Sequence, residues 1–207
     1  AQRPWDSPLT VKGKEQAKHA GLAVKEHLQR FGAAPVTRVF CSPLVRCLET
    51  AAAMMQSLGL ALDGTSAKIQ VDTCLSETVS EAWYRSWGIV GLSDSTWGGP
   101  KGYGVGEPLD GQTLRDEAHW DASDLYLSNE QLAREFGGLV DAEYPRSRHK
   151  RRYCWGSYET KEETRARVGG FCEAVQQRYP GETILLVSHG GPVMYCYEHL
   201  LGLGHGS

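Results

Sequence analysis

The stretch that decides the fold is residues 183–192, which read Thr-Ile-Leu-Leu-Val-Ser-His-Gly-Gly-Pro. The first six residues are almost wholly apolar, as expected of a strand that is buried on both faces of a parallel sheet. After the two glycines, apolar residues recur at helical spacing, which predicts a helix from about Pro192 to Leu201. A strand that leads directly into a helix is typical of α/β domains.

The same order of strand, polar loop and helix occurs in residues 39–46, which read Val-Phe-Cys-Ser-Pro-Leu-Val-Arg. Apolar periodicity and turn residues predict further elements on both sides of this stretch. Together they alternate along the chain, which indicates an α/β fold with a mostly parallel sheet flanked by helices. The predicted helices cover residues 11–31, 44–58, 114–119, 130–137 and 162–179, and the predicted strands cover 36–40, 69–73 and 183–188.

The two polar loops carry the residue types that bind phosphate. Ligands of α/β sheets bind at the carboxyl ends of the strands, and helix starts favour anions there. Arg46 is expected one turn into its helix, where a guanidinium can hold phosphate oxygens in a bidentate way. His189 is expected at the tip of its strand, and Gly190 and Gly191 would let a ligand approach the backbone. Taken singly, either side chain has an ordinary structural explanation; together they predict an anion site.

Several segments, in the right order, resemble the histidine phosphatase (phosphoglycerate mutase-like) superfamily. Residues 42–51 resemble its Ser-Pro-x-x-Arg-x-x-x-Thr-Ala element, residues 187–191 its second-histidine element, and residues 6–17 its opening helix. A weaker match joins residues 158–160 to Arg165 or Arg167, as in the family's Glu-Ser…Arg segment. Residues 3–6 resemble the branch near the ubiquitin-associated and SH3-domain tyrosine phosphatases and their plant and algal relatives. The resemblance implies a three-layer fold.

The resemblance also implies roles for individual residues. Arg46 and His189 would bind the phosphoryl group together with Gly190, and His189 would be the second catalytic histidine. Glu77 matches the acid/base carboxylate, with Glu81 as the alternative one helical turn later. The family reaction passes through a phosphohistidine and needs no metal or cofactor, so none is expected. The substrate would be a phosphorylated small molecule or a phosphoprotein.

One family element does not occur in these residues. The Arg-His-Gly segment, which supplies the nucleophilic histidine and a further arginine, is found nowhere in the sequence. The resemblance implies that this segment forms the first strand, ahead of Asp6, and we expect the sequence to be a fragment of an active enzyme. The alternative is a non-catalytic relative that serves as a binding or structural subunit of a larger assembly. In either case, these 207 residues by themselves are not expected to hydrolyse phosphate esters by this route.

The bulk properties are those of a globular protein. The chain has 207 residues, 41% hydrophobic and 23% charged, which fits a single domain over residues 1–207. Its net charge of −3 predicts no nucleic-acid partner, and no apolar run is long enough for a membrane span. Six cysteines without a Cys-x-x-Cys pair favour a reduced, cytoplasmic protein without a zinc site. A homodimer or an assembly subunit is possible.

Periodicity is lost from residue 93 to residue 155, which we interpret as a long insertion that forms a lid over the strand ends. Two other function classes have partial matches in the sequence. A serine hydrolase would need a Gly-x-Ser-x-Gly elbow, which is not in the sequence. The glycines of residues 102–106 superficially resemble a dinucleotide loop, but no convincing strand precedes them.

Overall fold

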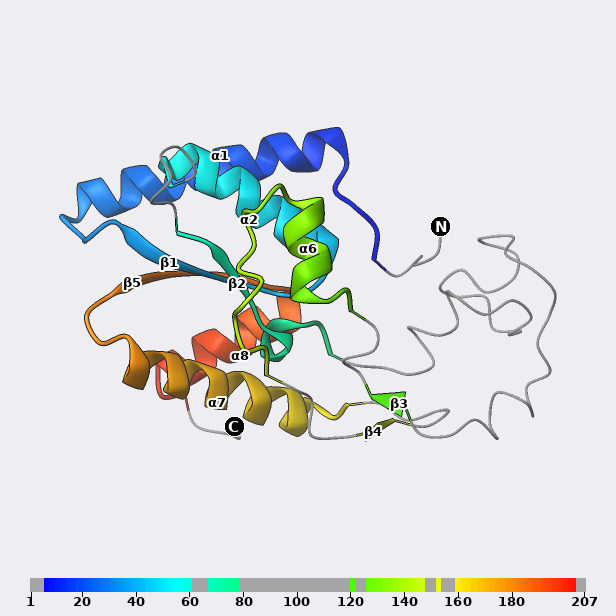
Figure 1. Cartoon of the computed structure of the whole chain (residues 1–207). Coiled ribbons are helices and arrows are strands. Elements are labelled where there is room, and N and C mark those ends of the chain that lie inside the picture. The colour runs from blue at the N-terminus through cyan, green and yellow to red at the C-terminus, as the bar shows by residue number, and fades with distance from the viewer. Residues whose placement is uncertain are drawn as a thin grey trace.

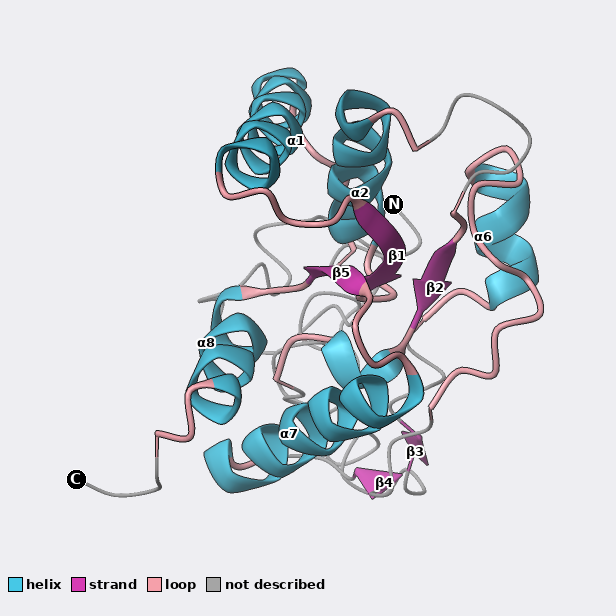
Figure 2. Ribbon diagram, turned by 90° about the vertical axis from the view of Figure 1, so that its left-hand side faces the viewer, coloured by secondary structure: helices cyan, strands magenta, loops and turns pink. Residues whose placement is uncertain are grey.

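The computed structural model describes residues 6–60, 67–78, 126–147 and 159–203, and the backbone alone of residues 120–121 and 152–153. Within them, three parallel strands form a sheet in the order β2-β1-β5. The strands are β1 (Val36–Cys41), β2 (Ile69–Val71) and β5 (Thr183–Val187). Helices α1 (Val11–Arg30) and α2 (Val45–Leu58) cover one face, and α7 (Lys161–Arg178) and α8 (Gly190–Leu200) cover the other (Figures 1 and 2). The α/β architecture with a parallel sheet between helices is thus confirmed.

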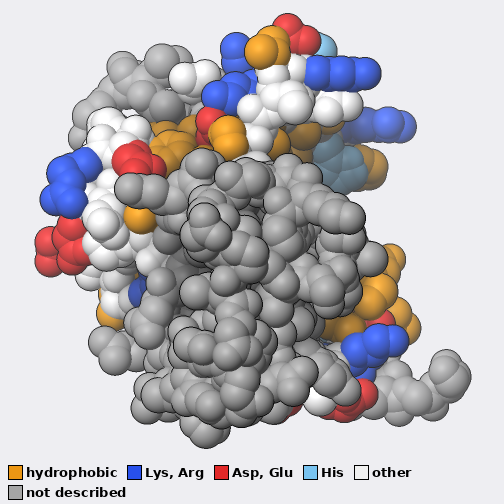
Figure 3. All heavy atoms as spheres, turned by 90° about the vertical axis from the view of Figure 1, so that its right-hand side faces the viewer, with side chains coloured by type: hydrophobic (Ala, Val, Ile, Leu, Met, Phe, Trp, Pro, Cys, Tyr) orange, Lys and Arg blue, Asp and Glu red, His pale blue; other side chains and the backbone are white. Residues whose placement is uncertain are grey.

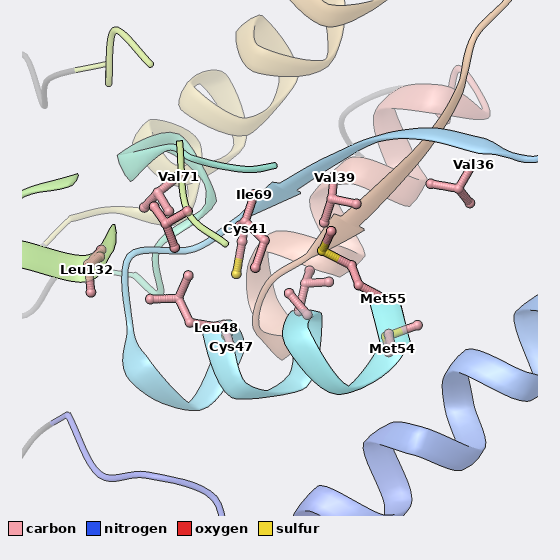
Figure 4. Close-up of a cluster of buried hydrophobic side chains, with 13 residues drawn as sticks. Val36, Val39, Cys41, Cys47, Leu48, Met54, Met55, Ile69, Val71 and Leu132 are labelled. Carbon is pink, nitrogen blue, oxygen red and sulfur yellow. The ribbon is translucent and has the colours of Figure 1, made fainter. Parts of the chain in front are cut away.

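The sheet has a core on each face because successive residues of β1 point in opposite directions. Val39 and Cys41 belong to the larger core, which lies between the sheet and α2 (Figure 4). Leu48 and Met55 of that helix belong to the same core. Phe40 points the other way and meets the Phe171 ring of α7 edge to face, with centroids 5.5 Å apart. The centre of the sheet is therefore packed on both faces, and this packing fixes the positions of the strand ends.

The predicted ends of the helices and strands lie close to those in the structure, and local contacts explain the differences. Helix α1 starts as expected after Thr10, whose side chain accepts a hydrogen bond from the Gly13 amide. The predicted strand 69–73 ends at Val71, because the Asp72 carboxylate accepts from the Cys74 amide and turns the chain into a 3₁₀ helix, η1 (Thr73–Leu75). Helix α8 begins two residues earlier than predicted. The predicted helix 114–119 lies outside the described residues.

Strand β5 differs from its prediction in burial. The apolar run of residues 184–186 predicts a strand buried on both faces, but these three side chains are only partly buried. The reason is its place in the sheet: in the part of the chain that the structure describes, β5 pairs with β1 alone and forms an edge.

Part of the predicted insertion packs on the opposite edge of the sheet, beside β2. Helix α6 (Asn129–Glu135) starts in a capping box formed by Ser128 and Gln131, and its Leu132 is fully buried in the core. Val140 forms a parallel bridge with Ile69 of β2. Two-residue strands β3 (Trp120–Asp121) and β4 (Arg152–Tyr153) pair with each other. Whether the whole stretch 93–155 acts as a lid stays a prediction.

Two further observations concern the charge of the surface and the length and hydropathy of the helices. On the face that Figure 3 shows, basic and acidic side chains of the described residues are interspersed. None of the described helices is both long enough and apolar enough to cross a membrane.

Candidate functional site

The two predicted loops lie side by side because their strands are neighbours. Strands β1 and β5 pair in parallel, with Cys41 opposite Val187 at their carboxyl ends. One further hydrogen bond, from the Ser42 amide to the Val187 carbonyl at 2.9 Å, extends the pairing into the loop. The side chains that follow the two strands therefore meet: Ser42 Oγ lies 2.7 Å from His189 Nε2.

Arg46 reaches the same histidine from the first turn of α2. Its guanidinium Nη2 lies 3.2 Å from His189 Nδ1. A guanidinium has donors only, so Nδ1 must accept this hydrogen bond. We infer that a neutral His189 carries its proton on Nε2 and donates it to Ser42 Oγ. The structure thus brings together the two side chains that the sequence predicts at one anion site.

The environment of His189 keeps its imidazole neutral. The residue is 7% exposed and lies at the start of α8. Burial, and then the positive charges of Arg46 and Arg167, lower its pKa from the ordinary 6.5 to about 3. An anion bound beside Arg46 and His189 would oppose the effect of the two arginines, because negative charge favours the imidazolium. Protonation of Nδ1 would then give the ring a donor for that anion.

Cys47 lies directly beneath the histidine. Its Sγ is 3.4 Å from His189 Nε2, and it can donate to the Ser188 carbonyl at 3.5 Å. Burial is the main reason that the pKa of this thiol rises to about 12, against a smaller opposite effect of Arg46. At neutral pH, Cys47 is therefore a thiol that packs against the imidazole and is not an activated nucleophile.

Glu77 approaches from the loop that follows η1. Its Oε1 accepts a hydrogen bond of 2.9 Å from the Thr78 amide. The same oxygen would lie 3.3 Å from a Cβ atom built on Gly191, which is two residues after His189. The third predicted residue thus reaches the same strand ends. The alternative, Glu81, lies outside the described residues.

The start of α8 completes the surroundings of the histidine. Gly190 and Gly191 are its first two residues, and amides in a first helical turn have no partner within the helix. A Cβ built on Gly190 would meet no atom of the described residues within 4 Å, which leaves room for a ligand beside the backbone among them. The predicted binding of phosphate by Gly190 fits this geometry and stays a prediction.

Asp6 is a supporting residue whose contact the sequence did not indicate. Helix α2 has no side-chain cap of its own, since Leu44 occupies the cap position. Instead, Asp6 Oδ1 accepts a hydrogen bond of 2.6 Å from the Val45 amide. A carboxylate at a helix start satisfies an amide and interacts favourably with the helix dipole. Asp6 therefore fixes the first turn of the helix that carries Arg46, from 39 residues away.

The structure shows which arginine pairs with Glu159, the glutamate of the weak Glu-Ser…Arg match. Arg167 forms a two-pronged ion pair with Glu159, at 2.7 Å for both hydrogen bonds. Arg165 pairs instead with Glu198 of α8, at 3.1 Å. The spacing in the sequence left both arginines open as the partner, whereas the structure selects Arg167.

No group of three or more His, Cys, Asp or Glu side chains is arranged to hold a metal ion within the described ranges. The predicted residues at the strand ends are the guanidinium of Arg46, the neutral imidazole of His189 and the carboxylate of Glu77. Such a set can bind and polarise an oxyanion and can move protons.

A model of the histidine phosphatase superfamily, branch 1, matches residues 1–85 and 120–207. The chain belongs to the histidine phosphatase superfamily. The matched residues include all four of the site residues that the sequence predicted, Arg46, Glu77, His189 and Gly190. Residues 86–119, between the two matched parts, fall within or next to the predicted insertion.

Solved structures of similar fold include two phosphatases. The crystal structure of the ecdysone phosphate phosphatase from Bombix mori, in complex with tungstate, is 20% identical to this histidine phosphatase chain, with a TM-score of 0.59. That match covers 98% of this chain but 60% of the other, so the present chain spans well under two thirds of that protein. A mycobacterial glucosyl-3-phosphoglycerate phosphatase complexed with VO3 is 19% identical, with a TM-score of 0.49 and coverage of 98% and 73%. The first likeness shows a shared fold. No curated protein matches the chain.

Proposed function

We propose that this chain is the phosphate-binding part of a phosphomonoesterase that works through a phosphohistidine intermediate. The observation that carries the proposal is the 3.2 Å contact between Arg46 and a buried, neutral His189 at the ends of two adjacent strands. Membership in the superfamily supports phosphatase chemistry. The nucleophilic histidine would come from an Arg-His-Gly segment of the full-length protein, since these 207 residues contain none.

Each site residue has a role in this reaction. The guanidinium of Arg46 and the imidazole of His189 would offset negative charge on the equatorial oxygens of the phosphoryl group in the transition state. The nucleophilic histidine would form a bond to phosphorus while the bond to the leaving oxygen breaks. Glu77 would protonate that oxygen, and the same carboxylate would then accept a proton from the water that hydrolyses the phosphohistidine.

The substrate class stays broad in this proposal. The phosphatase with the higher TM-score acts, by its name, on ecdysone phosphate. We propose a phosphorylated small molecule or a phosphoprotein as the substrate here. The described cysteines are free thiols, which supports a reducing compartment such as the cytoplasm.

The test is hydrolysis of 4-nitrophenyl phosphate by the full-length protein. Replacing one group that stabilises transition-state charge typically lowers the rate about 100- to 1,000-fold, and we expect this for Arg46→Ala and for His189→Ala. Arg38→Ala is the matched control, because Arg38 lies in β1 near the opposite ends of the strands and pairs with Glu182. Variants of Arg46 and His189 that are as active as the wild type would overturn the assignment.

A second candidate function is a non-catalytic binding subunit. The contact of Arg46 with His189 supports it as well, because an anion can be bound there without a nucleophile. The two functions differ in a simple comparison on the full-length protein. The enzyme should bind tungstate and also hydrolyse 4-nitrophenyl phosphate, whereas a binding subunit should bind tungstate without turnover. In both cases Arg46→Ala should weaken tungstate binding.

A further inference from the structure

The loop that carries Glu77 is held by contacts to its backbone carbonyls. Arg167 of α7 donates from Nη1 to three of them: Thr73 at 3.3 Å, Cys74 at 2.7 Å and Ser76 at 3.2 Å. The Ser76 carbonyl belongs to the peptide bond that precedes Glu77, so the guanidinium is hydrogen-bonded to the backbone directly before the proposed acid. Ser188, next to His189, donates to a fourth carbonyl of this loop, that of Leu75, at 2.6 Å.

Arg167 is itself fixed from its other side. Its Nε and Nη2 donate to the two carboxylate oxygens of Glu159, both at 2.7 Å. The two side chains are only 9% and 3% exposed. Such a two-pronged pair is strong and directional, and a planar guanidinium can hold a carboxylate and several carbonyls at once. A lysine at this position would keep the charge but could not repeat this set of contacts.

Helix α7 makes one more contact with the same loop. Thr164, one turn before Arg167, lies 3.3 Å from the hydroxyl oxygen of Thr78. The loop is thus tied on both sides of Glu77, by Arg167 before it and by Thr164 after it. Arg167 donates to the carboxylate of Glu159 and to carbonyls of the loop. Arg167 therefore acts on the backbone of the loop, which distinguishes it from the groups proposed to bind phosphate.

We infer that Arg167, oriented by Glu159, is a positioning residue that sets the Glu77 carboxylate at the leaving-group side of the site. The inference rests on the proposed function, in which Glu77 protonates the leaving oxygen. If Arg167 moves, the loop moves with it, and proton transfer loses its geometry. Arg46 and His189 lie outside this loop, on α2 and at the start of α8, so binding of the phosphoryl group should be affected less than proton transfer.

The test compares two substrates that differ in their need for a proton. 4-Nitrophenoxide is a stable leaving group, whereas phenoxide leaves far better as phenol, so general-acid catalysis matters mainly for phenyl phosphate. Because both substrates give the same phosphohistidine, the leaving-group step is compared through kcat/KM. General acids contribute about 100- to 10,000-fold, and we expect Glu77→Gln to lower kcat/KM for phenyl phosphate by about 100-fold more than for 4-nitrophenyl phosphate. For Arg167→Lys in the full-length protein, we expect the ratio of the two kcat/KM values to change about 10-fold in the same direction.

The matched control is Arg165→Lys, on the same helix. Arg165 pairs with Glu198, and both side chains are more than a quarter exposed, at 26% and 28%. This variant should leave the ratio unchanged. The ratio does not depend on the fraction of folded enzyme, so a merely structural loss lowers both rates equally. Glu159→Gln is the second variant in case Arg167→Lys folds poorly, because it keeps the arginine and weakens only its anchor.

The possible results separate the two proposals. A ratio that changes in Glu77→Gln, Arg167→Lys and Glu159→Gln supports the inference. A ratio that changes in Glu77→Gln alone overturns the inference and leaves the proposed function intact. A ratio that does not change in Glu77→Gln overturns the acid role of Glu77, and the inference with it.

Discussion

Two arginine–glutamate pairs lie at opposite ends of the same sheet. Arg167 and Glu159, at the carboxyl ends of the strands, are 9% and 3% exposed. Arg38 and Glu182, at the amino ends, are 35% and 30% exposed and lie 2.8 Å apart. The Arg38 guanidinium also stacks over the Tyr179 ring, at 3.9 Å from its centroid. The residue types are identical, and the surroundings differ.

The difference shows why position decides what an ion pair does. Water screens the pair at the amino ends, and such surface pairs contribute little to stability. The pair at the carboxyl ends is removed from water, so each charge depends on the other and on the carbonyls around it. A buried pair thus favours one geometry of its surroundings, which suits the loop that carries Glu77, the proposed acid.

The largest expected effect is on stability, from Glu159→Ala. Removing one partner of a buried pair leaves an uncompensated charge and typically costs about 3–5 kcal/mol of unfolding free energy. Glu182→Ala should change that free energy by an amount close to experimental error. Urea denaturation followed by circular dichroism measures both. Equal effects at the two ends would contradict the comparison.

The next effect concerns pH, because the carboxyl ends hold a histidine whose pKa is lowered to about 3, chiefly by burial. Between pH 6.5 and 3 the unfolded chain binds a proton at His189 that the folded chain does not. Stability should therefore fall as pH falls, by up to about 1.4 kcal/mol per pH unit from this group. In His189→Gln, urea midpoints measured from pH 7 to pH 4 should decline less steeply. Parallel profiles for the two proteins would show that His189 is already protonated when folded.

The smallest expected effects are on stability, from alanine substitutions at one closely packed glycine and one open glycine. A Cβ on Gly21 would lie 2.8 Å from Ser57 Cβ and 2.9 Å from the Met54 backbone, where α1 packs on α2. Gly21→Ala should cost about 1–3 kcal/mol through overpacking. Among the residues that the structure describes, a Cβ on Gly170 of α7 meets nothing within 4 Å, so Gly170→Ala should stabilise by roughly 0.5–1 kcal/mol. Opposite shifts in melting temperature are expected, and a tolerated Gly21→Ala would mean that the helices can separate there.

Much of the fold was predictable because its signals are local. The apolar run of residues 183–187 and the periodicity of residues 45–58 reflect alternation and helical spacing, which neighbouring residues alone express. The boundary errors arose where a side chain redirects the backbone, as Asp72 does after β2. The partial burial of β5 was not predictable, because it depends on which strands lie beside it.

The candidate site divides in the same way. Arg46, Glu77 and His189 could be proposed from motifs because each motif lies within a short stretch of sequence. The contact of Cys47 with the imidazole was missed, since its apolar spacing predicts only a core residue. The hydrogen bonds of Arg167 to carbonyls more than 90 residues away could not be predicted from the sequence, because every residue type has the same backbone carbonyl.

By itself, the sequence determined the order of strands and helices, the polar residues at two strand ends and the family to which they point. Those properties follow from side-chain chemistry along a short stretch of chain. Only the tertiary structure decided that His189 is buried and neutral against Arg46, and that a buried ion pair holds the Glu77 loop. Burial and backbone contacts depend on segments brought together from far apart in the chain, and the free energy of a charge depends on the water that those segments exclude.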